Sequence, residues 1–132
     1  MTTTETLIDR ARGLYEKKYP EGRLWWGTDG QPITGAQVVA HAEAAAERAA
    51  TINWKVPDSF RAGGPGEVAD GRVRTTYYAV GAIIEMLIRT ATGAPYADAW
   101  AWYLRPDLTA DEARAMYMDV AAFARRYGPE AA

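Results

Sequence analysis

The sequence contains no cysteine and only one histidine among its 132 residues. Without cysteine, the chain has no disulfides, no cysteine-based zinc site, no iron–sulfur cluster and no thiol nucleophile. Because His41 is the only imidazole, a metal site built from several histidines is excluded as well. We therefore expect no metal centre, and nothing in the sequence calls for a cofactor.

A clear excess of charge of either sign is also missing. The chain carries 15 Lys and Arg against 17 Asp and Glu, which gives a net charge of -2. A protein that binds a polyanion usually shows a basic excess or a basic stripe. The helix expected over residues 34–51 carries Glu43 and Glu47 but only Arg48 as a cation. No basic recognition helix is therefore visible, and we expect no DNA binding.

Long apolar runs are absent too. The longest covers residues 77–84 and is broken by Glu85, whereas a membrane-spanning helix needs about 20 apolar residues. The first residues, Met1 to Glu5, lack the basic and apolar regions of a signal peptide. We expect a cytoplasmic protein without membrane contact, in keeping with the lack of cysteine. The 26 alanines and the 12 arginines against three lysines are typical of GC-rich codons, as in a high-GC bacterium or phage.

Helical patterns cover most of the chain. Its length suits a single globular domain over residues 1–132. We expect a mainly α fold of about five helices, packed around one helix that is apolar almost all round. A small α+β fold is the alternative. The expected helices cover residues 4–19, 34–51, 76–92, 95–104 and 109–127, with 76–92 at the centre.

The helix ends carry recognisable signals. Thr34-x-x-Gln37 and Thr109-x-x-Glu112 are capping boxes, in which two side chains satisfy two backbone N–H groups at a helix start. Pro20 stops the first helix, and Gly93 is placed to close the central helix as a left-handed cap. The short tail after the last helix is expected to fray.

Turn signals predict one or two β-hairpins. Asp29-Gly30 stands between two short apolar pieces, so we expect a hairpin over residues 23–33, with Pro32 on an edge strand. A Gly- and Pro-rich loop follows at residues 53–74, and its last part, residues 67–74, is a candidate second hairpin.

No catalytic motif is present, and the candidates for chemistry are isolated side chains. A buried Glu85 would be a candidate general base, but its spacing to Arg89 also suits a polar pair on a helix surface. His41 is the only side chain that titrates near neutrality. It lies at the flank of an apolar helix face, where a lone histidine usually marks the boundary of the core.

A candidate anion site stands at the start of the central helix. Arg72, Arg74, Thr75 and Thr76 would combine two guanidinium groups and two hydroxyls with the free N–H groups and positive dipole end of a helix. The ordinary alternative is helix capping beside solvated arginines. The surrounding glycines do not form a Walker motif, because Gly-Lys-Ser/Thr is missing.

The most informative feature is the number of aromatic residues, with five Trp and eight Tyr. Trp25 and Trp26 are adjacent in an extended segment and should point to opposite faces. Trp100 and Trp102 lie about 160° apart around a helix. One ring of each pair must therefore be covered by a second layer, a loop, a ligand or a partner. We place Trp102 with Asp98 on the outer side of its helix.

These observations leave two classes of function open. The first is a non-enzymatic binding protein (an adaptor, inhibitor or regulator) that contacts another protein or a second copy of itself. Its expected contact residues are Trp25, Trp26, Asp98 and Trp102. The second is a small-ligand-binding protein or enzyme with an aromatic-walled pocket for an anionic or aromatic molecule. A closed aromatic cavity would favour the second class, and an exposed patch would favour the first.

Overall fold

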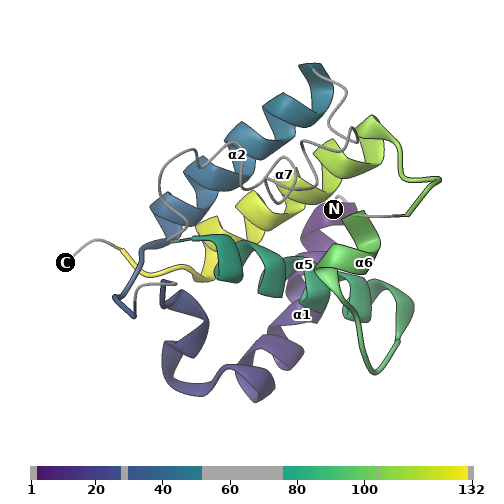
Figure 1. The fold of residues 1–132 in the computed structure, drawn as a ribbon. Coiled ribbons are helices and arrows are strands. Elements are labelled where there is room, and N and C mark those ends of the chain that lie inside the picture. Colours follow the sequence, from purple (N-terminus) through teal and green to yellow (C-terminus); the bar gives the residue numbers. More distant parts are fainter. Residues whose placement is uncertain (1–2, 28–29, 52–75, 104, 131–132) are drawn as a thin grey trace.

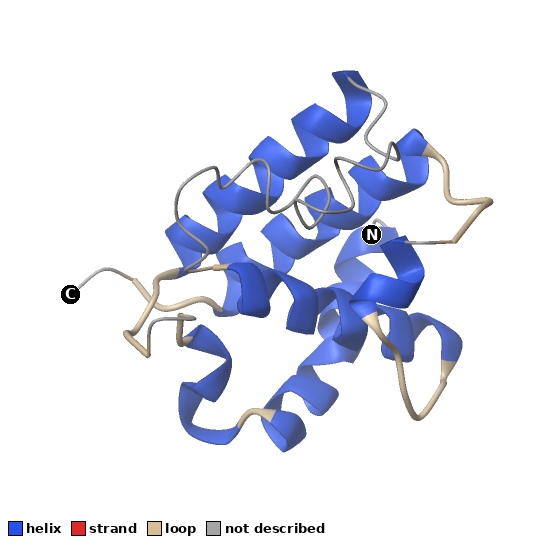
Figure 2. Cartoon of the chain, viewed as in Figure 1, coloured by secondary structure: helices blue, strands red, loops and turns tan. Residues whose placement is uncertain are grey.

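The fold is mainly α, as the sequence predicts (Figures 1 and 2). The structure is a computed structural model, and it describes residues 3–27, 30–51, 76–103 and 105–130. Within these ranges the chain forms five α-helices and one 3-10 helix, and no strand is present. The elements are α1 (Thr3–Lys18), η1 (Pro20–Trp25), α2 (Gly35–Thr51), α5 (Tyr77–Thr92), α6 (Ala99–Tyr103) and α7 (Ala110–Tyr127).

The hairpin predicted over residues 23–33 is replaced by η1 and one isolated antiparallel bridge, between Trp26 and Pro32. The N–H of Ile33 donates to the Trp25 carbonyl at 3.0 Å, and the N–H of Gly27 donates to the Gln31 carbonyl at 2.7 Å. The pairing does not continue before Trp26, because the preceding residues, Pro20–Trp25, form η1. The candidate hairpin over residues 67–74 and the loop over 53–74 lie outside the described residues.

Helices α2 and α7 pack side by side and antiparallel (Figure 1). Their facing sides are rich in small residues, which lets the two backbones come close. At the start of α2 the N–H of Gly35 donates to the Pro129 carbonyl at 2.8 Å, and an ion pair joins Glu43 to Arg125. The buried residues of this pair are Gly35, Val38, His41, Ala42, Ala45, Ala46, Ala49, Ala113, Tyr117, Val120, Ala121, Phe123 and Ala124.

Two glycines allow the closest approach between α2 and the end of α7. A Cβ atom added to Gly35 would lie 2.7 Å from the Ala124 carbonyl oxygen and 2.9 Å from the Cα of Gly128. A Cβ atom on Gly128 would collide with the same carbonyl and with the Cα of Gly35. Because these are backbone atoms, they can give way only if the helices move apart.

We therefore expect Gly35→Ala and Gly128→Ala each to lower the free energy of unfolding by about 1–3 kcal/mol, the usual cost of overpacking. Gly13→Ala is the matched control, because nothing lies within 4 Å of its Cβ position in α1. It should stabilise by about 0.5–1 kcal/mol, since alanine favours a helix over glycine. Urea denaturation of the three variants measures both signs. Similar effects at Gly13 and Gly128 would contradict the close packing.

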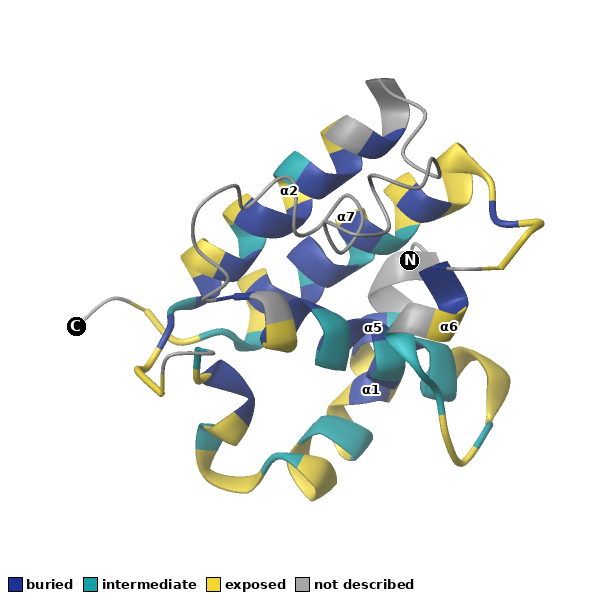
Figure 3. Ribbon diagram, in the orientation of Figure 1, coloured by how far each residue is buried: buried dark blue, intermediate teal, exposed yellow. Residues whose placement is uncertain are grey.

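Helix α5 touches every other described element, namely α1, α2, α6, α7 and η1. Its side chains Ile83, Met86 and Leu87 are fully buried. Figure 3 colours the residues of α5 by how far each is buried. Gly93 adopts the left-handed conformation at φ 74° and its N–H donates to the Arg89 carbonyl, so the predicted C-cap is confirmed. The most extensive helix contact is nevertheless the one between α2 and α7.

An aromatic cluster joins α1, η1 and α7 and takes up part of the aromatic surplus. The Nε1 of Trp25 donates to the Tyr15 hydroxyl at 2.7 Å. The Tyr15 ring meets Phe123 edge-on with ring centres 5.4 Å apart, and Phe123 lies 4.9 Å from Tyr127. Trp25 is only 4% exposed. It is therefore a core residue, which corrects the prediction of Trp25 as a contact residue on the surface.

Both predicted capping boxes are present. At α2 the Gln37 N–H donates to the Thr34 hydroxyl at 3.2 Å, and the Thr34 N–H donates to the Gln37 side chain at 2.7 Å. At α7, Thr109 and Glu112 make the same reciprocal pair. Among the described residues, no helix combines the length and apolar character needed to cross a membrane.

Candidate functional site

An open groove of about 560 Å³ lies between α5, α6 and α7. Helix α5 contributes one wall through its last two turns, and α7 contributes the other through its first half. The segment that leads into α6, together with α6 itself, closes one side, and Leu7 of α1 reaches in from another. The lining residues are Leu7, Leu87, Ile88, Ala91, Thr92, Tyr96, Ala97, Asp98, Ala101, Trp102, Arg105, Glu112, Ala115, Met116 and Asp119.

The floor of the groove holds Trp102, which is 7% exposed and packs edge-on against Tyr117 with ring centres 5.9 Å apart. The expectation that Trp102 lies on the outer side of its helix is therefore wrong. That expectation treated α6 as a helix with one covered face. In the fold, α6 is one short helix of five residues that packs against α5, and Tyr117 of α7 covers the Trp102 ring. The side chain of Trp100 is not among those described.

The segment before α6 contributes one aromatic and one acidic residue to the groove, Tyr96 and Asp98. Tyr96 is 73% exposed, and its hydroxyl donates to Asp98 Oδ2 at 3.3 Å. The other oxygen of Asp98 accepts the N–H of Ala101 at 3.2 Å and caps the start of α6. The charge of Asp98 raises the pKa of Tyr96. Asp98 and Trp102, both predicted as contact residues, thus line one groove.

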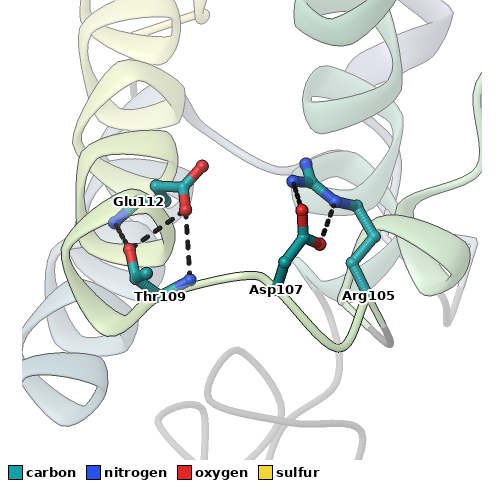
Figure 4. Close-up of polar contacts among 4 residues, drawn as sticks. All are labelled: Arg105, Asp107, Thr109 and Glu112. Carbon is teal, nitrogen blue, oxygen red and sulfur yellow. Dashed lines mark hydrogen bonds and ion pairs between the residues drawn. The ribbon is translucent and has the colours of Figure 1, made fainter.

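Two polar pairs lie between the end of α6 and the first turn of α7 (Figure 4), and Arg105 and Glu112 of these pairs line the groove. Arg105 binds Asp107 through two hydrogen bonds of 3.1 Å each, and this partner raises the pKa of the Arg105 guanidinium. On the next turn, Glu112 accepts the Thr109 N–H at 3.2 Å. Both Arg105 and Glu112 are therefore held in place by neighbours while they line the groove.

Glu85, the candidate general base, connects two helices. Its Oε2 accepts the backbone N–H of Ala99 at 3.0 Å, which ties the middle of α5 to the start of α6. The side chain is partly buried, and it does not line the groove. This hydrogen bond gives the Glu85 carboxylate a structural role.

His41 and Thr76 meet in the interior between α2 and α5. Both are 5% exposed, and His41 Nδ1 lies 2.5 Å from the Thr76 hydroxyl oxygen. Thr76 precedes α5 without a side-chain capping bond. Its hydroxyl therefore faces inward instead of toward an external anion. The three other residues of the predicted anion site, Arg72, Arg74 and Thr75, lie outside the described residues.

Trp25 ends η1 and only Trp26 is extended, so the predicted extended pair is not present. Trp26 is 49% exposed against 4% for Trp25. Trp26 does not line the groove. The four predicted contact residues are thus divided between the core, an exposed tryptophan after η1, and the groove.

Sequence reasoning missed most of the groove, although α7 carries a readable signal. Glu112, Ala115, Met116 and Asp119 follow the i, i+3, i+4, i+7 spacing of one helix face. That face lies beside the buried stripe, which contains Val120 and Phe123. A second stripe of this kind indicates that the helix faces both the core and a groove on the surface.

Alkaline conditions should weaken the fold, because burial raises the pKa of Tyr103 from 10.0 to about 12. Between pH 10 and 12 the unfolded chain releases this proton while the folded protein keeps it, so the free energy of unfolding falls as the pH rises. The full contribution is present below pH 10 and is lost as the pH passes 12. It amounts to about 2–3 kcal/mol.

Tyr103→Phe should flatten this decline in urea denaturation between pH 9 and 12. The matched control is Tyr78→Phe, because Tyr78 is 67% exposed. A decline that is the same in wild type and in Tyr103→Phe would show that this side chain does not drive the alkaline loss.

Comparison with family models, with curated proteins and with solved structures finds no match for this chain. The described residues contain no cluster of three His, Asp or Glu side chains that could hold a metal ion.

Proposed function

We propose that this chain is a small non-enzymatic binding protein that receives a segment of another protein in the groove between α5, α6 and α7. The observation that carries the proposal is the composition of the groove. We call Leu87, Trp102 and Met116 its apolar floor; Leu87 and Trp102 are buried and Met116 is partly buried. The charged lining residues are exposed (Arg105, Glu112) or partly buried (Asp98, Asp119). An apolar centre with a polar rim is the usual anatomy of a protein interface.

The geometry of the walls favours a helical occupant. The α7 wall offers residues at i, i+3, i+4 and i+7, which span about two helical turns. The opposite wall comes from the last turns of α5. An amphipathic helix laid between two helices inserts its apolar side chains at the same spacing, which is a recurrent mode of peptide recognition.

Binding is favoured over catalysis by the placement of the candidate acid–base groups. Neither Glu85 nor His41 lines the groove. Glu85 bonds to the backbone of Ala99, and His41 lies beside Thr76 in the interior. The proposal therefore keeps Asp98 and Trp102 as groove residues. Trp26 is a separate exposed side chain, and Trp25 belongs to the core.

A neutral helical peptide tests the proposal. The peptide carries leucine at i, i+3, i+4 and i+7, with alanine and glutamine elsewhere. Titrated into labelled protein, it should shift the backbone amide resonances of the groove residues. Ala115→Trp should weaken binding at least tenfold, because this exposed alanine lines the groove and the indole fills it. Ala110→Trp, at an exposed position of α7 outside the groove, should bind like the wild type.

Three results would overturn the proposal, and the first two concern the amide shifts. One is the absence of any amide shift at millimolar peptide. The other is a set of shifts centred on Trp26, which would move the contact surface away from the groove. Equal weakening by Ala115→Trp and Ala110→Trp would likewise show that the groove itself is not the binding site.

A small ligand is the second candidate, and the size of the groove favours it. A volume of about 560 Å³ falls within the usual range of small-molecule pockets, and Tyr96 and Trp102 supply aromatic lining. A screen of small aromatic compounds by the same amide shifts separates the two candidates. Compounds that bind at Trp102 while the peptide does not would favour the ligand function.

A further inference from the structure

We infer that the segment received by the groove is a basic amphipathic helix, with lysine or arginine flanking its apolar face. This inference rests on the proposed function and adds the chemistry of the partner. Its basis is the charge at the edges of the groove, which is independent of the apolar floor.

Among the described lining residues, the charged ones are three carboxylates, of Asp98, Glu112 and Asp119, and one guanidinium, of Arg105. Arg105 is bound to Asp107 through two hydrogen bonds of 3.1 Å each. Asp107 therefore offsets the charge of Arg105, and the charges of the described lining residues sum to a negative value.

The carboxylates come from two elements of the groove. Asp98 lies at the start of α6, and Glu112 and Asp119 lie seven residues apart on α7. Seven residues are two helical turns, or roughly 10 Å. A partner helix with basic residues at a similar separation would place them beside both carboxylates of α7 while its apolar face covers Trp102 and Met116.

Charge complementarity of this kind selects partners more than it adds affinity. Like charges facing each other across an interface are unfavourable, and opposite charges favour encounter and fix the orientation. Exposed rim charges are also screened by salt, over about 8 Å at physiological ionic strength. A preference for basic flanks should therefore be strong at low salt and should shrink as salt is added.

Two further peptides test the inference. Both keep the leucines of the neutral peptide, and their flanking positions carry either lysine or glutamate. At low salt the lysine peptide should bind the wild-type protein at least tenfold more tightly than the glutamate peptide. This difference should shrink at 0.5 M salt. Calorimetry measures both affinities.

Matched variants locate the effect. In D98N/E112Q/D119N the amide oxygens of the new side chains still accept the helix-capping hydrogen bonds, so the fold should be kept, and the preference for lysine should fall below threefold. The control E16Q/E21Q/D111N makes the same change in net charge at exposed positions outside the groove, and it should keep the preference. Asp119→Asn alone leaves the capping bonds of Asp98 and Glu112 unchanged, and it should remove part of the preference for lysine.

The outcomes separate this inference from the proposed function. Equal affinity for the lysine and glutamate peptides, with groove shifts still present, would overturn the basic partner and leave the groove as a binding site. Loss of the preference in both triple variants would also overturn it, because overall charge would then be the cause. Self-association in sedimentation that Ala115→Trp abolishes would assign the groove to a second copy of the chain instead.

Discussion

Trp102→Ala should lower the free energy of unfolding by about 3–5 kcal/mol, the usual cost of removing a buried tryptophan. Trp102 is 7% exposed and packs edge-on against Tyr117. Its removal would leave a cavity between α6 and α7 and would also open the floor of the groove. A domain of this size is stable by only about 5–15 kcal/mol, so the variant should be near the limit of folding. Urea denaturation followed by circular dichroism measures the loss.

Trp26→Ala is the matched control for this prediction. The Trp26 ring is 49% exposed, and substitutions of such side chains usually change stability by well under 1 kcal/mol. If Trp102→Ala were as stable as Trp26→Ala, the Trp102 ring would not be part of the core, and its assignment to the groove floor would be wrong.

Trp25→Ala should have a comparable effect, again about 3–5 kcal/mol. Trp25 is 4% exposed and stacks on Phe123 at 6.4 Å between ring centres. It connects η1 to both α1 and α7, so its loss should loosen the packing of the segment after Pro20. The near-ultraviolet circular dichroism signal, which reports fixed aromatic side chains, should fall together with the stability.

Tyr15→Phe isolates the polar part of this cluster. The phenylalanine ring keeps the aromatic packing but removes the hydroxyl that accepts the Trp25 indole N–H at 2.7 Å. A buried donor left without its acceptor costs about 1–3 kcal/mol. A Tyr15→Phe variant as unstable as Trp25→Ala would place the stabilisation in the hydrogen bond and not in the buried ring.

These variants bear on how the aromatic surplus is used. The sequence indicated that one ring of each tryptophan pair needs a second layer of cover. For Trp25 the cover comes from Tyr15 and Phe123, and for Trp102 it comes from Tyr117. These buried rings therefore stabilise the domain, whereas the exposed aromatic side chains lie on its surface.

The sequence predicts only part of the candidate site. It predicts Asp98 and Trp102 as contact residues because they share one side of a helix, and both line the groove. The predicted outer position of Trp102 is wrong, since its ring is buried against Tyr117 of α7. Glu112 was recognised as half of a capping box, but its second position, at the edge of a groove, depends on where α7 lies against α5.

The sequence by itself determined the mainly α class, the helix caps and the approximate limits of four helices. The helix predicted over residues 95–104 is shorter in the structure, where α6 covers only Ala99–Tyr103. The caps depend on local interactions: Thr34 with Gln37, Thr109 with Glu112, and the left-handed backbone at Gly93 each involve residues a few positions apart. Only the tertiary structure decided which helices pair and which rings are buried. The antiparallel contact of α2 with α7 requires Gly35 and Gly128, 93 positions apart in the chain, to meet at backbone distance. The groove likewise arises where α5, α6 and α7 come together, because the periodic stripe on α7 alone does not show which helices lie opposite it.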